Sequence, residues 1–252
     1  MEELKTMERL SVENVSFSFG FKEILKDINF TLEKGKVVSI VGPSGGGKTT
    51  LLHLCVKLLT LEEGKIRNSF KSSSFAFQEA RLLPWKNVID NISLGLRAQN
   101  IKKAKADDLA KKIALKFGLE EDDFEKFPKD LSGGMKQRVS FARALVLNPS
   151  ILFLDEPFSA LDIGLKKELQ NLLINEIETN KLSILFITHD LMEAIRLSDE
   201  ILVLKAEPVG HIVKSFKVEM PRINRDDNFV YEQTAKLLSD EYIINTFELG
   251  FK

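Results

Sequence analysis

The sequence predicts an α/β fold: a mostly parallel central sheet, an N-terminal antiparallel β part and a helical part. Residues 37–42 (VVSIVG), 150–156 (SILFLDE) and 183–190 (SILFITHD) are nearly continuous apolar runs. Such runs are typical of parallel strands that are covered on both faces. The amphipathic stretch 168–178 (ELQNLLINEIE) lies between the second and third runs, where a crossover helix belongs.

The antiparallel and helical parts follow from two other patterns. Residues 9–19 and 24–35 alternate apolar and polar side chains on either side of Gly20, which predicts an antiparallel pair with one solvated face. From about 88 to 147 the pattern is helical, and residues 101–119 carry apolar positions at helical spacing beneath a lysine-rich face. We interpret those lysines as a solvated surface.

Length and composition indicate one domain, 1–252, with internal parts. The chain has 252 residues, of which 44% are hydrophobic, enough for a single large core. We expect residues 1–87 and 148–215 to form the core and residues 88–147 to form a helical subdomain. Residues 216–252 form a C-terminal tail that becomes polar and irregular before a last helical stretch, and no function is assigned to it.

Charge and hydropathy exclude several classes of protein. A formal net charge of −1 gives no bulk basicity for nucleic acid. No apolar run approaches the roughly 18 to 20 residues that span a bilayer, and the first ten residues lack the apolar stretch of a secretory signal. These patterns predict a cytoplasmic chain. The single cysteine, Cys55, lies among leucines and is expected to be a small buried hydrophobe.

Residues 42–50 (GPSGGGKTT) carry the strongest functional pattern. They follow a buried strand and open a helix, the context that makes GxxxxGKT a P-loop. Backbone N–H groups of such a turn cradle phosphate oxygens, Lys48 supplies a positive charge and the Thr49 hydroxyl suits Mg²⁺. ATP or GTP binding is therefore expected. The residues expected to contact the nucleotide here are Gly42, Pro43, Ser44, Gly45, Gly46, Gly47, Lys48, Thr49 and Thr50.

Polar residues follow the other two buried strands, at the same edge of the predicted sheet. Asp155 is placed to reach the Mg²⁺ shell, and Glu156 to polarise the attacking water. His189 follows the third strand, within reach of a γ-phosphate if the strands are neighbours.

A second segment also looks suited to an anion. In residues 131–138 (LSGGMKQR), Ser132 is a natural helix N-cap, and two glycines let backbone N–H groups approach a ligand. Because the P-loop already supplies a phosphate site, this segment raises the question of which phosphate it serves.

Together these motifs resemble the ATP-binding cassette proteins, over nearly the whole chain. The P-loop, LSGGM, ILFLDE, SALD (159–162) and His189 occur in that family's order. Residues 75–92 (FAFQEARLLPWKNVIDNI) and the stretch 203–222 look most like the ATPase subunits of the nitrate, sulfonate and taurine class of importers. The resemblance implies a P-loop NTPase core and roles for further residues. Gln78 would lie near Mg²⁺ and water, Ser132, Gly133, Gly134 and Met135 would form the signature, and Ser159 to Asp162 the D-loop. His189 would be the switch histidine, and Phe19 would stack on adenine.

The resemblance also implies partners. In this family the signature faces the nucleotide held by a second copy, so two chains enclose two ATP molecules with Mg²⁺. It further implies docking on separate membrane permease subunits at the cytoplasmic face of the membrane, served indirectly by a substrate-binding protein. No nucleic acid partner is expected, and the transported solute cannot be identified from this chain.

Some positions depart from the family pattern or admit two interpretations. Met135 stands where the family commonly has Gln, and Phe19 where Tyr is commoner. Phe19 either stacks on adenine or faces the core beside Phe17. In the loop 80–91 (ARLLPWKNVIDN), Trp85 either anchors the permease, together with Leu82 and Leu83, or packs the joint between the core and the helical part.

Two other functional classes remain as alternatives at this point. One is a soluble cassette ATPase acting on nucleic acid or ribosomes. The other is a nucleotide-binding regulator without turnover, which the presence of Glu156 and His189 disfavours.

Overall fold

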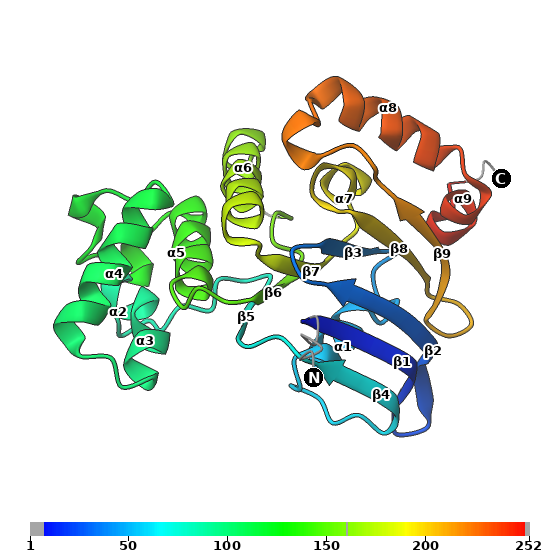
Figure 1. The fold of residues 1–252 in the computed structure, drawn as a ribbon, viewed down its shortest axis with the longest axis horizontal. Helices are drawn as coiled ribbons and strands as arrows, with labels where there is room; N and C mark the ends of the chain where they lie inside the picture. Colours follow the sequence, from blue (N-terminus) through cyan, green and yellow to red (C-terminus); the bar gives the residue numbers. More distant parts are fainter. Residues whose placement is uncertain (1–7, 160, 250–252) are drawn as a thin grey trace, which may run out of the picture.

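The computed structural model describes residues 8–159 and 161–249, in which the strands form two sheets (Figure 1). The first sheet has the order β2-β1-β4 and is antiparallel throughout, as predicted for its first two strands. Its strands are β1 (Arg9–Phe19), β2 (Lys22–Glu33) and β4 (Glu63–Asn68).

The second sheet has the order β5-β6-β7-β3-β8-β9. Its first five strands run parallel, and only β9 pairs antiparallel, with β8. Every residue of the central strands β3, β6 and β7 is buried, which explains their continuous apolar sequences. The predicted mostly parallel sheet is confirmed. Its strands are β3 (Val37–Val41), β5 (Ser73–Ala76), β6 (Ile151–Asp155), β7 (Ser183–Thr188), β8 (Glu200–Lys205) and β9 (His211–Lys217).

Helices connect these strands at the points that matter for the site. Helix α1 (Lys48–Cys55) follows β3, α6 (Ile163–Asn180) crosses from β6 to β7 as predicted, and α7 (Leu191–Leu197) follows β7. Cys55, at the end of α1, is fully buried, and burial raises the pKa of its thiol to about 12. The cysteine is therefore the small buried hydrophobe that its leucine-rich surroundings predicted.

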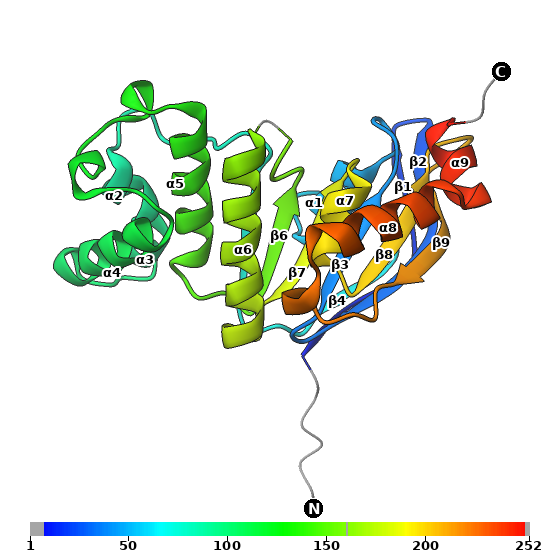
Figure 2. The ribbon, with the colours of Figure 1, turned by 90° about the horizontal axis from the view of Figure 1, so that it is seen from above.

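The segment between β5 and β6 is helical and lies at one end of the molecule, beyond α6 (Figures 1 and 2). Its helices are α2 (Val88–Ile92), α3 (Leu94–Ala98), α4 (Lys103–Lys116) and α5 (Gly133–Leu145), with short 3-10 turns at Glu121–Asp123 and Pro128–Asp130. Three alanines of α4 are buried below its exposed lysines, which explains its helical pattern.

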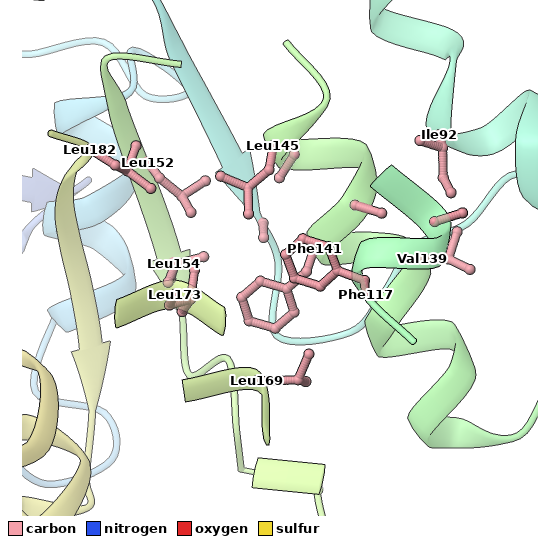
Figure 3. Close-up of a cluster of buried hydrophobic side chains, with 14 of the residues drawn as sticks. Ile92, Phe117, Val139, Phe141, Leu145, Leu152, Leu154, Leu169, Leu173 and Leu182 are labelled. Carbon is pink, nitrogen blue, oxygen red and sulfur yellow. The ribbon is translucent and has the colours of Figure 1, made fainter. Parts of the chain in front are cut away.

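One apolar cluster joins this helical end to the second sheet (Figure 3). The Phe117 and Phe141 rings stack with centroids 6.3 Å apart, and Phe141 lies 5.9 Å from Phe158. Phe158 follows the end of β6 by three residues, and Leu169 of α6 completes the contact. The helical end is thereby packed against the strand that carries Asp155.

The chain after β9 differs from its predicted character. The stretch after Lys217 is polar and has little regular structure, as expected; most of its residues are exposed, but Arg222 and Arg225 are buried. It contains a 3-10 turn at Arg222–Asn224 and leads into two helices in place of one helical stretch. These are α8 (Asp227–Leu238), which packs against α7, and α9 (Glu241–Phe247), which packs against β8.

Among the helices of the described residues, none combines the length and the apolar character needed to cross a bilayer.

Candidate nucleotide site

The P-loop connects β3 to α1 through glycines that the local geometry requires. Gly45 and Gly47 have φ angles of 79° and 89°, a conformation that strains any side chain. A Cβ at Gly42 would lie 2.2 Å from the backbone oxygen of Leu204. Gly47 is the N-cap of α1 and makes no side-chain cap bond, so the helix N-terminus faces the loop with free backbone donors.

Lys48 begins α1 and turns its side chain into the loop. Its Nζ atom donates hydrogen bonds to the carbonyl oxygens of Gly42 (2.9 Å) and Pro43 (2.8 Å). Only 4% of the residue is exposed, and burial lowers its pKa, although the nearby charges of Glu156 and Asp155 oppose that shift. A desolvated cation at the centre of a backbone cradle attracts a phosphate more strongly than an exposed one.

Asp155 ends β6 beside the start of α1. The hydroxyl of Thr49 donates to its Oδ1 atom at 3.3 Å. Burial raises the pKa of Asp155, and the Thr49 bond offsets part of that shift. A bound cation would favour the carboxylate form.

Gln78, Glu156 and His189 converge, although they come from three separate segments. His189 Nδ1 lies 3.2 Å from Glu156 Oε2, and Gln78 Nε2 donates to the same oxygen at 3.5 Å. Gln78 also donates to Ser159 Oγ at 3.4 Å. The neighbouring order β5-β6-β7 produces this meeting, since the three residues follow the ends of these parallel strands at one edge of the sheet.

The backbone of Glu156 is strained at this position. Its φ angle is 41°, in the left-handed region that a non-glycine residue rarely adopts. The Ser159 hydroxyl donates to the Glu156 carbonyl at 3.1 Å, and Glu156 N–H donates to the Ile187 carbonyl at 3.0 Å. Strain held in place by surrounding bonds is typical of functional positions.

The residues of the second predicted phosphate segment lie elsewhere. Ser132 caps α5, as predicted, by accepting a hydrogen bond from Met135 N–H at 3.2 Å. Asp162 caps α6 by accepting from Leu165 N–H at 3.0 Å. Ser132, Gly134 and Asp162 line one groove together, and no P-loop residue lines it.

In both ribbon views α5 lies on the far side of α6 and β6 from α1 (Figures 1 and 2). Gly133 has open space around it. Within the predicted segment 159–162, Ala160 lies outside the described residues. The structure therefore brings Asp162 together with the signature residues, but not with the P-loop of the same chain.

Phe19 and Trp85, whose roles had two interpretations, are both exposed. Phe19 is 54% exposed and packs edge-on against Phe17, with ring centroids 4.9 Å apart, so it does not face the core. Trp85 is 69% exposed and does not pack the joint, whereas Leu82 does pack against the main apolar cluster. The core-packing interpretation thus holds for Leu82 and is wrong for Phe19 and Trp85.

The loop that carries Trp85 is held by a buried amide. Asn91 is fully buried; its Oδ1 accepts from Leu83 N–H at 2.8 Å and its Nδ2 donates to Leu83 and Lys86 carbonyls. Arg143 of α5 donates to the carbonyls of Ala80 and Arg81 from the other side. Trp85 is therefore displayed from an ordered turn.

The residues present suit Mg²⁺ and a nucleoside triphosphate. Within residues 8–159 and 161–249 there is no group of three or more His, Cys, Asp or Glu that could hold a metal alone. Mg²⁺ is commonly bound through one or two protein oxygens plus substrate phosphates and water, which is what Thr49 and Asp155 offer beside the P-loop. The glycine cradle and buried Lys48 suit the phosphates.

Several residues around the site were missed by the sequence interpretation. Thr188 and Asp190 flank His189. The Thr188 hydroxyl donates a hydrogen bond to Glu193, and Lys166 of α6 donates one to Asp190. The spacing of Asp190 and Glu193 is that of a capping box, a signal that could have revealed the start of α7, whereas no local pattern points to Lys166.

Comparisons with known proteins agree with this geometry. A family model described as ABC transporter matches residues 25–159. The aliphatic sulfonates import ATP-binding protein of Corynebacterium glutamicum is 39% identical over 228 residues, which cover 90% of this chain and 92% of that protein. The taurine import ATP-binding protein of Escherichia coli O157:H7 is 37% identical over 220 residues, covering 84% and 86%.

Among solved structures, a dimeric ATP-binding cassette in a post-hydrolysis state, bound to ADP and Pi, superimposes with a TM-score of 0.75. It is 29% identical, over 84% of this chain and 99% of that chain. These likenesses confirm the resemblance seen in the motifs, and they do not favour an ATPase acting on nucleic acid or ribosomes. The chain belongs to the ABC transporter family and is an ATP-binding, ATP-hydrolysing subunit that uses Mg²⁺.

Proposed function

We propose that this chain is the motor of an importer for a small anion or organic solute of the nitrate, sulfonate or taurine kind. It would act from the cytoplasmic face of the membrane on separate permease subunits. A substrate-binding protein would deliver the solute to those subunits. The observation that carries the motor role is the meeting of Gln78, Glu156 and His189 beside the P-loop. The relatives named for sulfonate and taurine import support the solute class.

In the proposed reaction, Lys48 and the P-loop N–H groups hold the phosphates of ATP. Thr49 and Asp155, with Gln78 nearby, would hold Mg²⁺, which when bound supplies charge that neutralises the phosphates. Glu156 orients the attacking water and draws its proton as the bond to ADP breaks. His189 approaches the γ-phosphate, and exposed Phe19 stacks on adenine.

We further propose that the complete site forms between two copies. Ser132, Gly133, Gly134 and Asp162 stand on a surface away from their own P-loop, as the separate groove of the signature residues indicates. A two-fold arrangement would place them over the partner's nucleotide and close two sites at once. Hydrolysis would then remove the γ-phosphate that holds the two copies together.

Glu156→Gln tests this proposal, because it keeps the shape of the side chain and removes the carboxylate. The purified variant should bind ATP, lose at least 100-fold in steady-state phosphate release, and double its mass in light scattering when Mg²⁺ and ATP are added. Ser11→Ala, in β1 and away from the site, serves as the control. Hydrolysis by Glu156→Gln at the parent rate would remove Glu156 from its proposed role.

We also propose that the loop of Leu82, Leu83 and Trp85, with Trp85 as its exposed anchor, lines the groove that receives the permease. An exposed tryptophan on an ordered turn is a typical interface anchor. Trp85→Ala should keep the ATPase rate of the isolated subunit but weaken its assembly with the membrane subunits by about 2 kcal/mol or more. Tyr231 is also an exposed aromatic residue but lies on α8, so Tyr231→Ala is the matched control. Assembly and transport equal to the parent would exclude this role of Trp85.

The solute class is tested in vesicles that hold the assembled transporter. ATP-dependent uptake of labelled taurine, an alkanesulfonate and nitrate should be compared in the presence of the binding protein. Uptake of a sulfonate or nitrate supports the proposal, whereas an active transporter that moves none of these solutes contradicts it.

A further inference from the structure

A ring of polar contacts surrounds the backbone of His189. The Thr188 hydroxyl donates to Glu193 Oε2 at 2.6 Å and accepts from Asp190 N–H at 3.0 Å. Asp190 Oδ1 accepts from the N–H groups of Met192 (2.8 Å) and Glu193 (3.3 Å), which caps α7. Both neighbours of His189 are therefore held, while the imidazole itself is left about half exposed.

One cation closes this ring from a different helix. Lys166 of α6 lies 2.6 Å from Asp190 Oδ2 and 2.6 Å from Glu193 Oε1. Its backbone N–H donates to the Asp162 carbonyl at 2.9 Å, in the first turn of α6. Lys166 thus connects the helix that begins at Asp162 with both sides of His189.

The ion pairs of Lys166 are stronger than ion pairs on an exposed surface. Glu193 is only 3% exposed, and burial raises its pKa, an effect that the bonds from Lys166 and Thr188 offset only in part. Burial lowers the pKa of Lys166, but its bonds to Asp190 and Glu193 outweigh burial, so its pKa is raised. A partly buried cation with two charged partners, one of them buried, holds a fixed position better than an exposed ion pair does.

We propose that Lys166 is a positioning residue for the hydrolysis step: it fixes the backbone around His189 and ties it to the start of α6. The inference rests on the role proposed above for His189. Lys166 touches neither nucleotide nor water in this scheme. Its effect passes through Asp190, Glu193 and Thr188 to the direction in which the imidazole meets Glu156, 3.2 Å away.

Through Lys166, the groove that Asp162 lines is also connected to His189. Asp162 lines the groove that contains the signature residues, and Lys166 lies one turn further along the same helix. A displacement of the first turn of α6 would move Lys166 and with it the two carboxylates beside His189. Closure of that groove by a second copy would in this way set the imidazole in its working position.

Lys166→Met tests the proposal by keeping the aliphatic length and removing the cation. Its kcat for ATP should fall at least tenfold while its KM for ATP changes less than threefold, because the P-loop belongs to β3 and α1. Lys166→Arg keeps the charge and should retain at least half of the parent kcat.

Lys167→Met is the matched control, since Lys167 is the next residue of the same helix and its partner, Asp227, is exposed. It should keep the parent kcat. A parent-like kcat in Lys166→Met, or an equal loss in Lys167→Met, would overturn the proposal.

A double variant separates positioning from simple charge balance. Lys166→Met leaves Glu193 buried without its cation and could lower kcat by disturbing the fold. Lys166→Met with Glu193→Gln removes both charges, so its thermal unfolding should resemble that of the parent, while its kcat should stay at least fivefold low. Recovery of the parent kcat in the double variant would show that Lys166 only neutralises Glu193.

His189→Ala, measured beside these variants, separates the two proposals. If His189→Ala keeps the parent kcat, the role proposed for His189 fails. If His189→Ala is inactive while the double variant is fully active, only the role of Lys166 fails.

Discussion

At the P-loop, the effect of a single residue depends on the short distances between its atoms and the neighbouring backbone. Gly42 has no room for a side chain because the Leu204 carbonyl occupies the position, and the Gly42 carbonyl itself accepts a hydrogen bond from Lys48. The same residue therefore sets both the closeness of the loop to β8 and the position of the buried cation. A methyl group here would move backbone, which yields far less readily than the end of a side chain.

Gly42→Ala should lower the free energy of unfolding by about 2 kcal/mol or more and weaken ATP binding at least tenfold. The physical reason is the 2.2 Å approach of the added Cβ to the Leu204 oxygen. Urea denaturation and nucleotide titration measure the two effects. Gly133→Ala is the control, because its Cβ would meet nothing within 4 Å, and it should unfold like the parent or at slightly higher urea. An unchanged ATP affinity in Gly42→Ala would contradict this reasoning.

At the scale of elements, the segment after β9 holds α7 from its C-terminal end. Arg225 donates from Nη1 to the carbonyls of Ile195 and Ser198, each at 2.7 Å, and from Nη2 to Val218 at 3.1 Å. Burial, together with the neighbouring charge of Arg222, lowers the pKa of Arg225 to about 10. The partners of Arg225 are therefore backbone carbonyls. The last carbonyls of a helix have no partner within the helix, so those at the end of α7 need such a donor.

Arg225→Met should destabilise the protein by about 3 kcal/mol, because several buried carbonyls lose a charged donor. Urea denaturation gives the change in free energy, and limited proteolysis should cut the chain after β9 sooner than in the parent. Lys236→Met, at an exposed position of α8, should change stability by less than about 0.5 kcal/mol. Equal stabilities of the two variants would mean that Arg225 does not hold this segment.

At the scale of the whole molecule, the P-loop and the second segment proposed to bind phosphate, 132–134, lie apart. The P-loop is beside β8, and the signature groove lies between α5 and α6. One chain cannot bring both to one phosphate without large rearrangement of the apolar cluster that joins them. Two chains related by a two-fold axis could bring the P-loop of one chain to the signature groove of the other without a change in the shape of either chain.

Mixing two inactive variants tests this arrangement. Ser132→Arg should bind ATP like the parent but hydrolyse it at least 50-fold more slowly, and Lys48→Ala should fail to bind ATP. Mixed dimers combine the intact P-loop of the first with the intact signature of the second, so phosphate release should return to at most half the parent rate per mixed dimer. Absence of recovery, or a loss of ATP affinity in Ser132→Arg, would contradict the two-chain site.

Local patterns were sufficient for much of this protein. The buried strands, the crossover helix α6, the P-loop and the N-cap role of Ser132 all depend on residues within a few positions of one another, so composition and spacing predicted them. The meeting of Gln78, Glu156 and His189 was partly predictable, because parallel strands end at one edge.

By itself the sequence determined the fold class and the chemistry available along the chain, because backbone conformation and amphipathic pattern are short-range properties. Only the tertiary structure decided that Phe19 and Trp85 are exposed and that Arg225 is buried. It also decided that Lys166 reaches the neighbours of His189 across 24 residues. These depend on which distant surfaces pack together, and a charged residue such as Arg225 carries no local pattern that reveals its burial by another element.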